Sequence, residues 1–141
     1  MAEIRAVEWG TIDYWHDRIS RYLNENNYPY SQTALLPRVV YVGLKNNVLT
    51  GFIAGHLTRR LNCEGELEWI NVMAGYRGSG VASELLKLLA EWFAKQGALK
   101  ICIDVEPANS AAQRFYRRHG AENLNQHWLY WKDISVVLKN A

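Results

Sequence analysis

The chain of 141 residues has the length of one domain, and its formal charge is only +2. Division into two domains would leave neither half a proper core, so we predict one domain over residues 1–141. Acidic and basic residues are interleaved, which excludes the electrostatic footprint of a nucleic-acid or anionic-membrane partner. No run reaches the roughly 18 apolar residues that a membrane-spanning helix needs.

The start of the chain and its cysteines predict a reduced, cytoplasmic setting. The opening MAEIRAVEWG lacks the basic stretch and the continuous apolar core of a signal peptide. The two cysteines, Cys63 and Cys102, form no C-x-x-C pair. Cys102 lies within the apolar run LKICIDV, so we expect it to be a buried small hydrophobic residue.

The first third of the chain predicts a short strand over 4–7 and then a helix. Thr11 is a suitable N-cap, and apolar or aromatic residues follow it at helical spacing as far as Leu23. The region 24–37 is rich in Asn, Tyr and Pro, which predicts a loop.

A hairpin and a third strand are expected next. Two β-rich runs, 39–45 and 49–58, flank Asn46 and Asn47, which tolerate the positive φ values of a tight hairpin turn. A third strand is predicted over 66–73.

The second half alternates strands and helices. Gly78-Ser79-Gly80 opens an amphipathic helix that ends at Gly97. A buried strand over 99–105, a helix over 109–119 and one or two strands within 128–138 follow. The fold class is therefore α/β. Because a helix joins them, the strands at 66–73 and 99–105 should be parallel if they are neighbours.

The glycine-rich turn between the third strand and the long helix is the strongest functional signal. Glycine lets the backbone turn sharply and approach a ligand closely, and the first amides of a helix have no partner within the helix. Together with the helix dipole, those N–H groups favour a phosphate. An ordinary tight turn is the alternative interpretation.

Two familiar phosphate-binding motifs fit this turn poorly. Gly75 and Gly80 have the P-loop separation, but 81–82 are Val-Ala instead of a lysine followed by a hydroxyl residue. The dinucleotide pattern G-x-G-x-x-G matches at Gly78 and Gly80, but Ser83 replaces its third glycine.

A third motif, R/Q-x-x-G-x-G/A, is satisfied by Arg77, Gly80 and Ala82. It is followed at a suitable distance by the block EPANSAAQRFY, which leads to Gly120. At these residues the sequence resembles the GNAT superfamily of N-acetyltransferases, over about residues 65–121. The resemblance implies a single-domain GNAT fold. In that fold a mixed, mostly antiparallel sheet is flanked by helices and splayed between the strands at 66–73 and 99–105.

The resemblance also implies a cosubstrate, acetyl-coenzyme A, and the residues that bind it. Main-chain groups of the turn would hold the pyrophosphate, strand backbone would pair with the pantetheine arm, and an N–H near 70–72 would polarise the thioester carbonyl. Arg114, Arg117 and Arg118 of the 109–119 helix are other candidates for phosphate contacts, but a solvated basic face is the favoured interpretation. The binding residues implied are Ile70, Asn71, Val72, Arg77, Gly78, Ser79, Gly80, Val81, Ala82, Ser83, Asn109, Ala112, Phe115 and Tyr116.

Acid–base chemistry is assigned on the same resemblance. Tyr116 matches the family's tyrosine beside the coenzyme sulfur, where a phenol can protonate the departing thiolate; its alternative role is core packing. Glu68 is the first candidate for the base that deprotonates the amine, with Glu66 and Asp104 in reserve. The alternative is that Glu68 is an exposed acid on a strand and that water and backbone take the place of the base. Alternation would place Glu64 on the same face as these two glutamates if the strand begins early enough. Asn109 is also a good N-cap.

The function expected is direct acetyl transfer in a ternary complex to the amine of a small molecule or a peptide. The rival is a non-catalytic acyl-coenzyme A sensor or interaction module on the same fold. A homodimer is an expectation from the family alone. The four histidines show no metal-ligand spacing, so we predict no metal and give them structural or surface roles.

Overall fold

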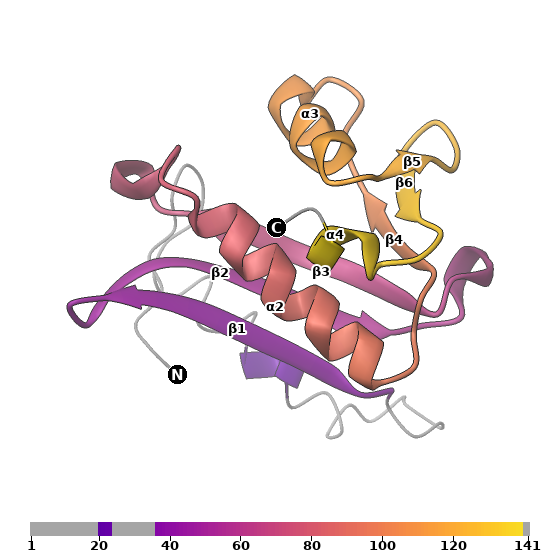
Figure 1. The fold of residues 1–141 in the computed structure, drawn as a ribbon, viewed down its shortest axis with the longest axis horizontal. Coiled ribbons are helices and arrows are strands. Elements are labelled where there is room, and N and C mark those ends of the chain that lie inside the picture. The colour runs from indigo at the N-terminus through magenta and orange to yellow at the C-terminus, as the bar shows by residue number, and fades with distance from the viewer. Residues whose placement is uncertain (1–19, 24–35, 140–141) are drawn as a thin grey trace.

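The computed structural model describes residues 20–23 and 36–139, which form the coloured ribbon of Figure 1. The strand predicted at 4–7 and the N-cap predicted at Thr11 lie outside the described residues, as does most of the predicted loop. Residues 20–23 are helical, as expected for the end of the first helix.

The predicted hairpin is confirmed. Strand β1 (Arg38–Lys45) is antiparallel to β2 (Val48–Leu57). Asn46 and Asn47, which join them, have φ values of 51° and 65°, as a type I′ turn requires. A 3₁₀ turn, η2 (Arg60–Asn62), then leads to β3 (Gly65–Val72), which is antiparallel to β2.

The second half follows the predicted alternation. The 3₁₀ turn η3 (Ala74–Tyr76) precedes α2 (Val81–Lys95), and β4 (Ile101–Asp104) precedes α3 (Ser110–Arg118). Strand β4 is shorter than the predicted 99–105. The amides of Leu99 and Lys100 donate to Glu64 Oε1 at 2.9 and 3.1 Å, so this segment is held by a side chain before the strand begins.

The end of the chain differs from the prediction. Strand β6 (Trp128–Trp131) is present, but the second half of the predicted strand region forms a helical turn, α4 (Val136–Lys139). The cause is local: the Ser135 amide and hydroxyl both donate to the Asp133 carboxylate, which fixes a turn instead of an extended chain. The two-residue strand β5 (Glu122–Asn123) was not predicted.

The described strands form one sheet in the order β1-β2-β3-β4-β6-β5. Only β3 and β4 are parallel, as expected for strands joined by a helix, so the sheet is mixed and mostly antiparallel. Their pairing is confined to Gly65 with Ile101 and Glu66 with Cys102. Beyond these two pairs the strands separate, which confirms the predicted splay.

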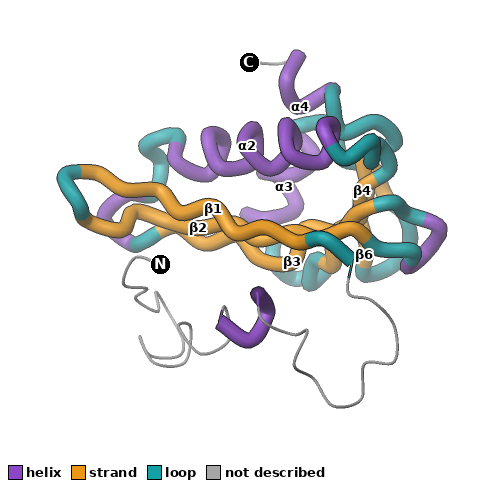
Figure 2. Tube along the Cα trace, turned by 90° about the horizontal axis from the view of Figure 1, so that it is seen from below, coloured by secondary structure: helices purple, strands orange, loops and turns teal. Residues whose placement is uncertain are grey.

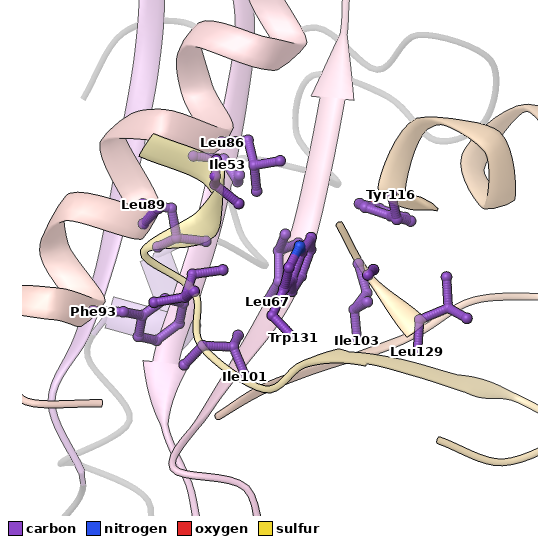
Figure 3. Close-up of a cluster of buried hydrophobic side chains, with 14 of the residues drawn as sticks. Ile53, Leu67, Leu86, Leu89, Phe93, Ile101, Ile103, Tyr116, Leu129 and Trp131 are labelled. Carbon is purple, nitrogen blue, oxygen red and sulfur yellow. The ribbon is translucent and has the colours of Figure 1, made fainter. Parts of the chain in front are cut away.

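The two faces of the sheet are packed differently. Figure 2 shows α2 and α4 on one face of β1–β3 and the helical residues 20–23 on the other. The main core lies on the α2 face and includes Leu67, Phe93 and Trp131 (Figure 3). A smaller cluster of Leu49, Phe52 and Met73 marks the opposite face, which we call the far face.

Both cysteines are free and buried, which confirms the expectation for Cys102. Burial is the main cause that raises the pKa of each thiol. In the described ranges, 20–23 and 36–139, no helix combines the length and the hydropathy needed to cross a bilayer.

Candidate functional site

The glycine-rich turn adopts a backbone that explains its glycines. Gly78 and Gly80 have φ values of 78° and 89°. No heavy atom lies within 4 Å of the position that a Cβ would occupy at either residue. Glycine is therefore favoured here by left-handed backbone geometry, which other residues adopt only with strain, and not by lack of space.

The turn presents the first amides of α2 without internal acceptors. The earliest backbone bond runs from the Glu84 amide to the Gly80 carbonyl at 3.1 Å, and no side chain caps the helix. Among the described residues, the amides of Val81, Ala82 and Ser83 have no recorded hydrogen-bond acceptor. Three aligned N–H groups at the positive end of a fifteen-residue helix make a site for an anion.

A cavity of about 620 Å³ lies against these amides. It is bounded by the end of β3, the glycine turn, the first turn of α2 and one side of α3. Its lining residues are Val72, Tyr76, Arg77, Gly78, Gly80, Val81, Ala82, Ser83, Ala111, Phe115 and Arg118. The cavity thus extends from the anion site to Val72, at the end of β3 that is not paired with β4.

Strand β3 carries a bulge where the splay opens. Ala54 of β2 pairs with Trp69, whereas the next residue, Gly55, pairs with Leu67. Glu68 is therefore the extra residue. The bulge changes which side chains face which way: Leu67 belongs to the main core, whereas Trp69 packs with the smaller cluster on the far face.

Polar side chains gather on the far face next to this bulge. The Tyr22 hydroxyl is 2.6 Å from His56 Nδ1, and His56 Nε2 is 3.4 Å from Glu66 Oε1. Arg60 Nη1 is 3.8 Å from Glu66 Oε2. One ligand atom each from His56, Glu66 and Glu68 lie within 4.8 Å of one another. We call these five residues, Tyr22, His56, Arg60, Glu66 and Glu68, the bulge cluster.

The family model for acetyltransferases of the GNAT family matches residues 3–121, which is most of the chain. The chain belongs to this family. Curated relatives include N-alpha-acetyltransferase 30 of Schizosaccharomyces pombe, with 28% identity over 97 residues, covering 67% of this chain and 65% of the relative. An uncharacterized N-acetyltransferase of Mycobacterium bovis is 35% identical over 72 residues, covering 50% of this chain and 46% of the relative. The chain thus spans between about half and two thirds of these relatives.

Solved structures of similar fold support the same architecture. The PaiA N-acetyltransferase of Thermoplasma acidophilum, in complex with coenzyme A, has a TM-score of 0.63 at 18% identity, covering 86% of this chain and 70% of the other. A nourseothricin acetyltransferase has a TM-score of 0.62 at 22% identity, covering 67% of this chain and 64% of the other.

Eight of the predicted binding residues line the cavity at the glycine-rich turn. They are Val72, Arg77, Gly78, Gly80, Val81, Ala82, Ser83 and Phe115. The others, Ile70, Asn71, Ser79, Asn109, Ala112 and Tyr116, are not among its lining residues. Asn109 caps α3, because its side chain accepts from the Ala112 amide at 3.1 Å. Asn109 therefore acts as the N-cap of α3, which was its alternative role.

Two of the predicted binding residues, Arg77 and Ser83, already have hydrogen-bond partners. Arg77 is exposed, and its Nε donates to the Val72 carbonyl at 3.3 Å, so the side chain ties the turn to the end of β3. Ser83 Oγ lies 3.1 Å from His119 Nε2, which links α2 to the end of α3. Burial first, and then the charges of Arg118 and Lys87, lower the pKa of His119 and favour its neutral form.

Tyr116 lies in the main core. It is 5% exposed, and its ring packs edge-on against Trp131, with centroids 6.0 Å apart (Figure 3). Burial raises the pKa of its phenol, so the hydroxyl stays protonated at neutral pH.

The acidic candidates separate in space. Glu64 precedes β3, so the condition for its sharing a face with Glu66 and Glu68 is not met; its carboxylate accepts from backbone at the start of β4 instead. The hydrogen bonds from Leu99 and Lys100 lower its pKa. Asp104 is exposed at the end of β4, opposite Trp128.

Sequence reasoning missed three residues of the cavity and three of the bulge cluster, which are Tyr22, His56 and Arg60. Tyr76 and Ala111 were not considered, and Arg118 was weighed but given a solvated role. A signal existed for two of them, because Ala111, Phe115 and Arg118 follow helical i, i+4, i+7 spacing. His56 was assigned a structural or surface role, and no local signal pairs it with Glu66, which lies on another strand.

Proposed function

We propose that this chain transfers an acetyl group from acetyl-coenzyme A to a primary amine, directly within a ternary complex, and that residues 1–141 form one domain for this purpose. The observation that carries the proposal is the set of unbonded amides at the start of α2, which faces a cavity that reaches the unpaired end of β3 at Val72. A pyrophosphate suits the amides, and an extended pantetheine arm suits unpaired strand backbone.

The proposed chemistry needs two proton transfers. Glu68 accepts a proton from the substrate ammonium, and the neutral amine then attacks the thioester carbon. As the C–N bond forms and the C–S bond breaks, the phenol of Tyr116 gives its proton to the leaving sulfur, and the excess amine proton restores the phenol. A main-chain N–H within residues 70–72 stabilises the carbonyl oxygen as it gains charge. The phenol of Tyr116 is protonated at neutral pH, as a proton donor must be, although burial, which raises its pKa, also makes it a weaker acid.

Thiol release from acetyl-coenzyme A across a panel of amines tests the proposal. We expect release that depends on both the amine and acetyl-coenzyme A. Binding of coenzyme A without release by any amine would favour a non-catalytic sensor. Fluorescence titration with coenzyme A and with NAD provides the second test, and tighter binding of NAD would contradict the proposed cosubstrate.

A further inference from the structure

The bulge cluster contains a carboxylate whose surroundings are unusual for a structural residue. The Glu66 side chain is only 7% exposed, and its Oε1 has no hydrogen-bond partner among residues 20–23 and 36–139. The exposed guanidinium of Arg60 lies near the other oxygen, Oε2. Leaving a buried carboxylate oxygen without a donor is costly, so we expect Oε1 to contact a ligand.

The contact between Glu66 and His56 has the length of an edge of a tetrahedral metal site. His56 Nε2 is 3.4 Å from Oε1 and yet forms no hydrogen bond with it. Two ligands of one metal ion point at a common centre and not at each other, which gives such a contact. Zinc bonds of about 2.0 to 2.2 Å at tetrahedral angles separate two ligand atoms by about 3.3 to 3.5 Å. Adjacent ligands of octahedral magnesium are only about 3.0 Å apart, so the observed separation fits zinc better.

We infer that His56 Nε2, Glu66 Oε1 and a carboxylate oxygen of Glu68 form a binding site for Zn²⁺. One ligand atom from each of these residues lies within 4.8 Å of the others. The half-buried Glu68 also has an interaction of its own, which it exchanges for the metal as its side chain rotates toward the other two ligands. The histidine spacing that predicted no metal carries no sign of this site, because the ligands come from two strands, β2 and β3.

Tyr22 supplies the outer support that a histidine ligand commonly has. Its hydroxyl is 2.6 Å from His56 Nδ1. Zinc at Nε2 places the ring proton on Nδ1, where the N–H can donate to the phenol oxygen. A metal-bound histidine usually donates from its second ring nitrogen in this way, which fixes the orientation of the ring. Tyr22 is therefore a positioning residue for the metal site.

The zinc site overlaps the proposed catalytic base. Bound Zn²⁺ engages the Glu68 carboxylate and prevents it from accepting the amine proton, so zinc should inhibit acetyl transfer. Coenzyme A binding at the start of α2 should not change, because that site uses main-chain amides. The inference does not rest on the proposed function, since metal binding is measured on the protein without substrate.

Co²⁺ serves as a spectroscopic probe for the zinc site. Tetrahedral Co²⁺ absorbs visible light far more strongly than octahedral Co²⁺, and a thiolate ligand adds a charge-transfer band in the near ultraviolet. Co²⁺ added to the full chain should give a stoichiometric tetrahedral spectrum without the thiolate band, and Zn²⁺ should remove this spectrum. A thiolate band would assign the metal to Cys63 and Cys102 and overturn the inference, as would an octahedral spectrum.

Variants locate the binding at the cluster. His56→Gln removes the nitrogen ligand and should weaken Zn²⁺ binding, measured by equilibrium dialysis, by at least about 100-fold. Tyr22→Phe keeps the aromatic ring and should weaken binding by roughly 10-fold, which gives a second test if the first variant folds poorly. His127→Gln is the matched control, since this histidine is exposed, and it should leave binding unchanged. Unchanged affinity in both cluster variants would overturn the inference, as would equal affinities for Mg²⁺ and Zn²⁺.

The results distinguish this inference from the proposed function. If Zn²⁺ binds in a His56-dependent manner but no amine is acetylated, the inference stands and the catalytic proposal fails. If amines are acetylated but Co²⁺ gives no tetrahedral spectrum, the catalytic proposal stands and the inference fails.

Discussion

The two candidate regions of this molecule use different chemical groups: main-chain amides at the start of α2 and side chains at the bulge cluster. At the start of α2, the groups that face the cavity are main-chain amides held by one continuous segment of sequence. At the bulge cluster, the groups are side chains from residues 20–23, β2, the η2 turn and β3. A backbone site presents the same N–H groups whichever side chains flank it, whereas a side-chain site changes with each substitution. The first suits a constant cosubstrate, and the second suits the selection of an acceptor.

The largest effect on catalysis should come from a substitution in the bulge cluster. Glu68→Gln removes the proposed base, and we expect kcat/KM for a primary amine to fall by roughly 1000-fold, because general-base catalysis commonly contributes that much. The dissociation constant of coenzyme A, measured by calorimetry, should stay within about twofold of the wild-type value, because the glutamine leaves the anion site intact. A fall of less than about threefold in kcat/KM would favour a base made of water and backbone.

Coenzyme A binding at the start of α2 should be sensitive to a change of backbone conformation and not to a change of side-chain charge. Gly80→Val places a β-branched residue at a φ of 89°, and the resulting strain should weaken coenzyme A binding by about 100-fold. Gly75→Ala is the matched control, because Gly75 is not among the positive-φ glycines and an added Cβ meets nothing within 4 Å. Calorimetric titration of both variants makes the comparison, and equal affinities would contradict an anion site at this turn.

The effect expected at Tyr116 is smaller than that expected in either region. Tyr116→Phe removes the proposed proton donor and should lower kcat by roughly 30-fold without changing the affinity for coenzyme A. The ring remains to pack against Trp131, so the melting temperature should stay within about 2 °C. An unchanged kcat would assign Tyr116 to core packing alone.

The smallest expected effect is a pH dependence of coenzyme A binding at the start of α2. Because the pKa of His119 is lowered, the residue is neutral in the free protein, and its contribution to stability is present above the ordinary histidine pKa and lost as the pH falls through the lowered value. A bound pyrophosphate near Ser83 would raise that pKa again, so coenzyme A binding should take up a fraction of a proton and strengthen severalfold as the pH falls from 8 to about 6.

Calorimetry in buffers of different ionisation enthalpy measures this proton uptake. His119→Gln, which keeps a hydrogen-bonding group near Ser83, should abolish most of the uptake. Uptake that persists in this variant would assign the proton to another group, such as the phosphate itself.

The sequence predicted the backbone conformation of the glycine turn well, because that conformation requires particular residues. Positive φ values at Gly78 and Gly80 leave a visible glycine pattern, and the hairpin at Asn46 and Asn47 was readable for the same reason. The bulge cluster was not predictable, since the register that sets His56 opposite Glu66 depends on a bulge at Glu68 that has no local signature. Strand β5, with two residues, is too short for a periodic pattern.

The link between β3 and β4 has a mechanical consequence. Only two residue pairs join β1–β3 to the β4–β6 part of the sheet, so along this seam the sheet is held at one end and open at the other. An extended arm that hydrogen-bonds to both edges would act as a surrogate strand and stiffen the seam. Hydrogen exchange of amides in the separated parts of β3 and β4 should therefore slow when coenzyme A is added, while exchange in the β1–β2 hairpin stays the same.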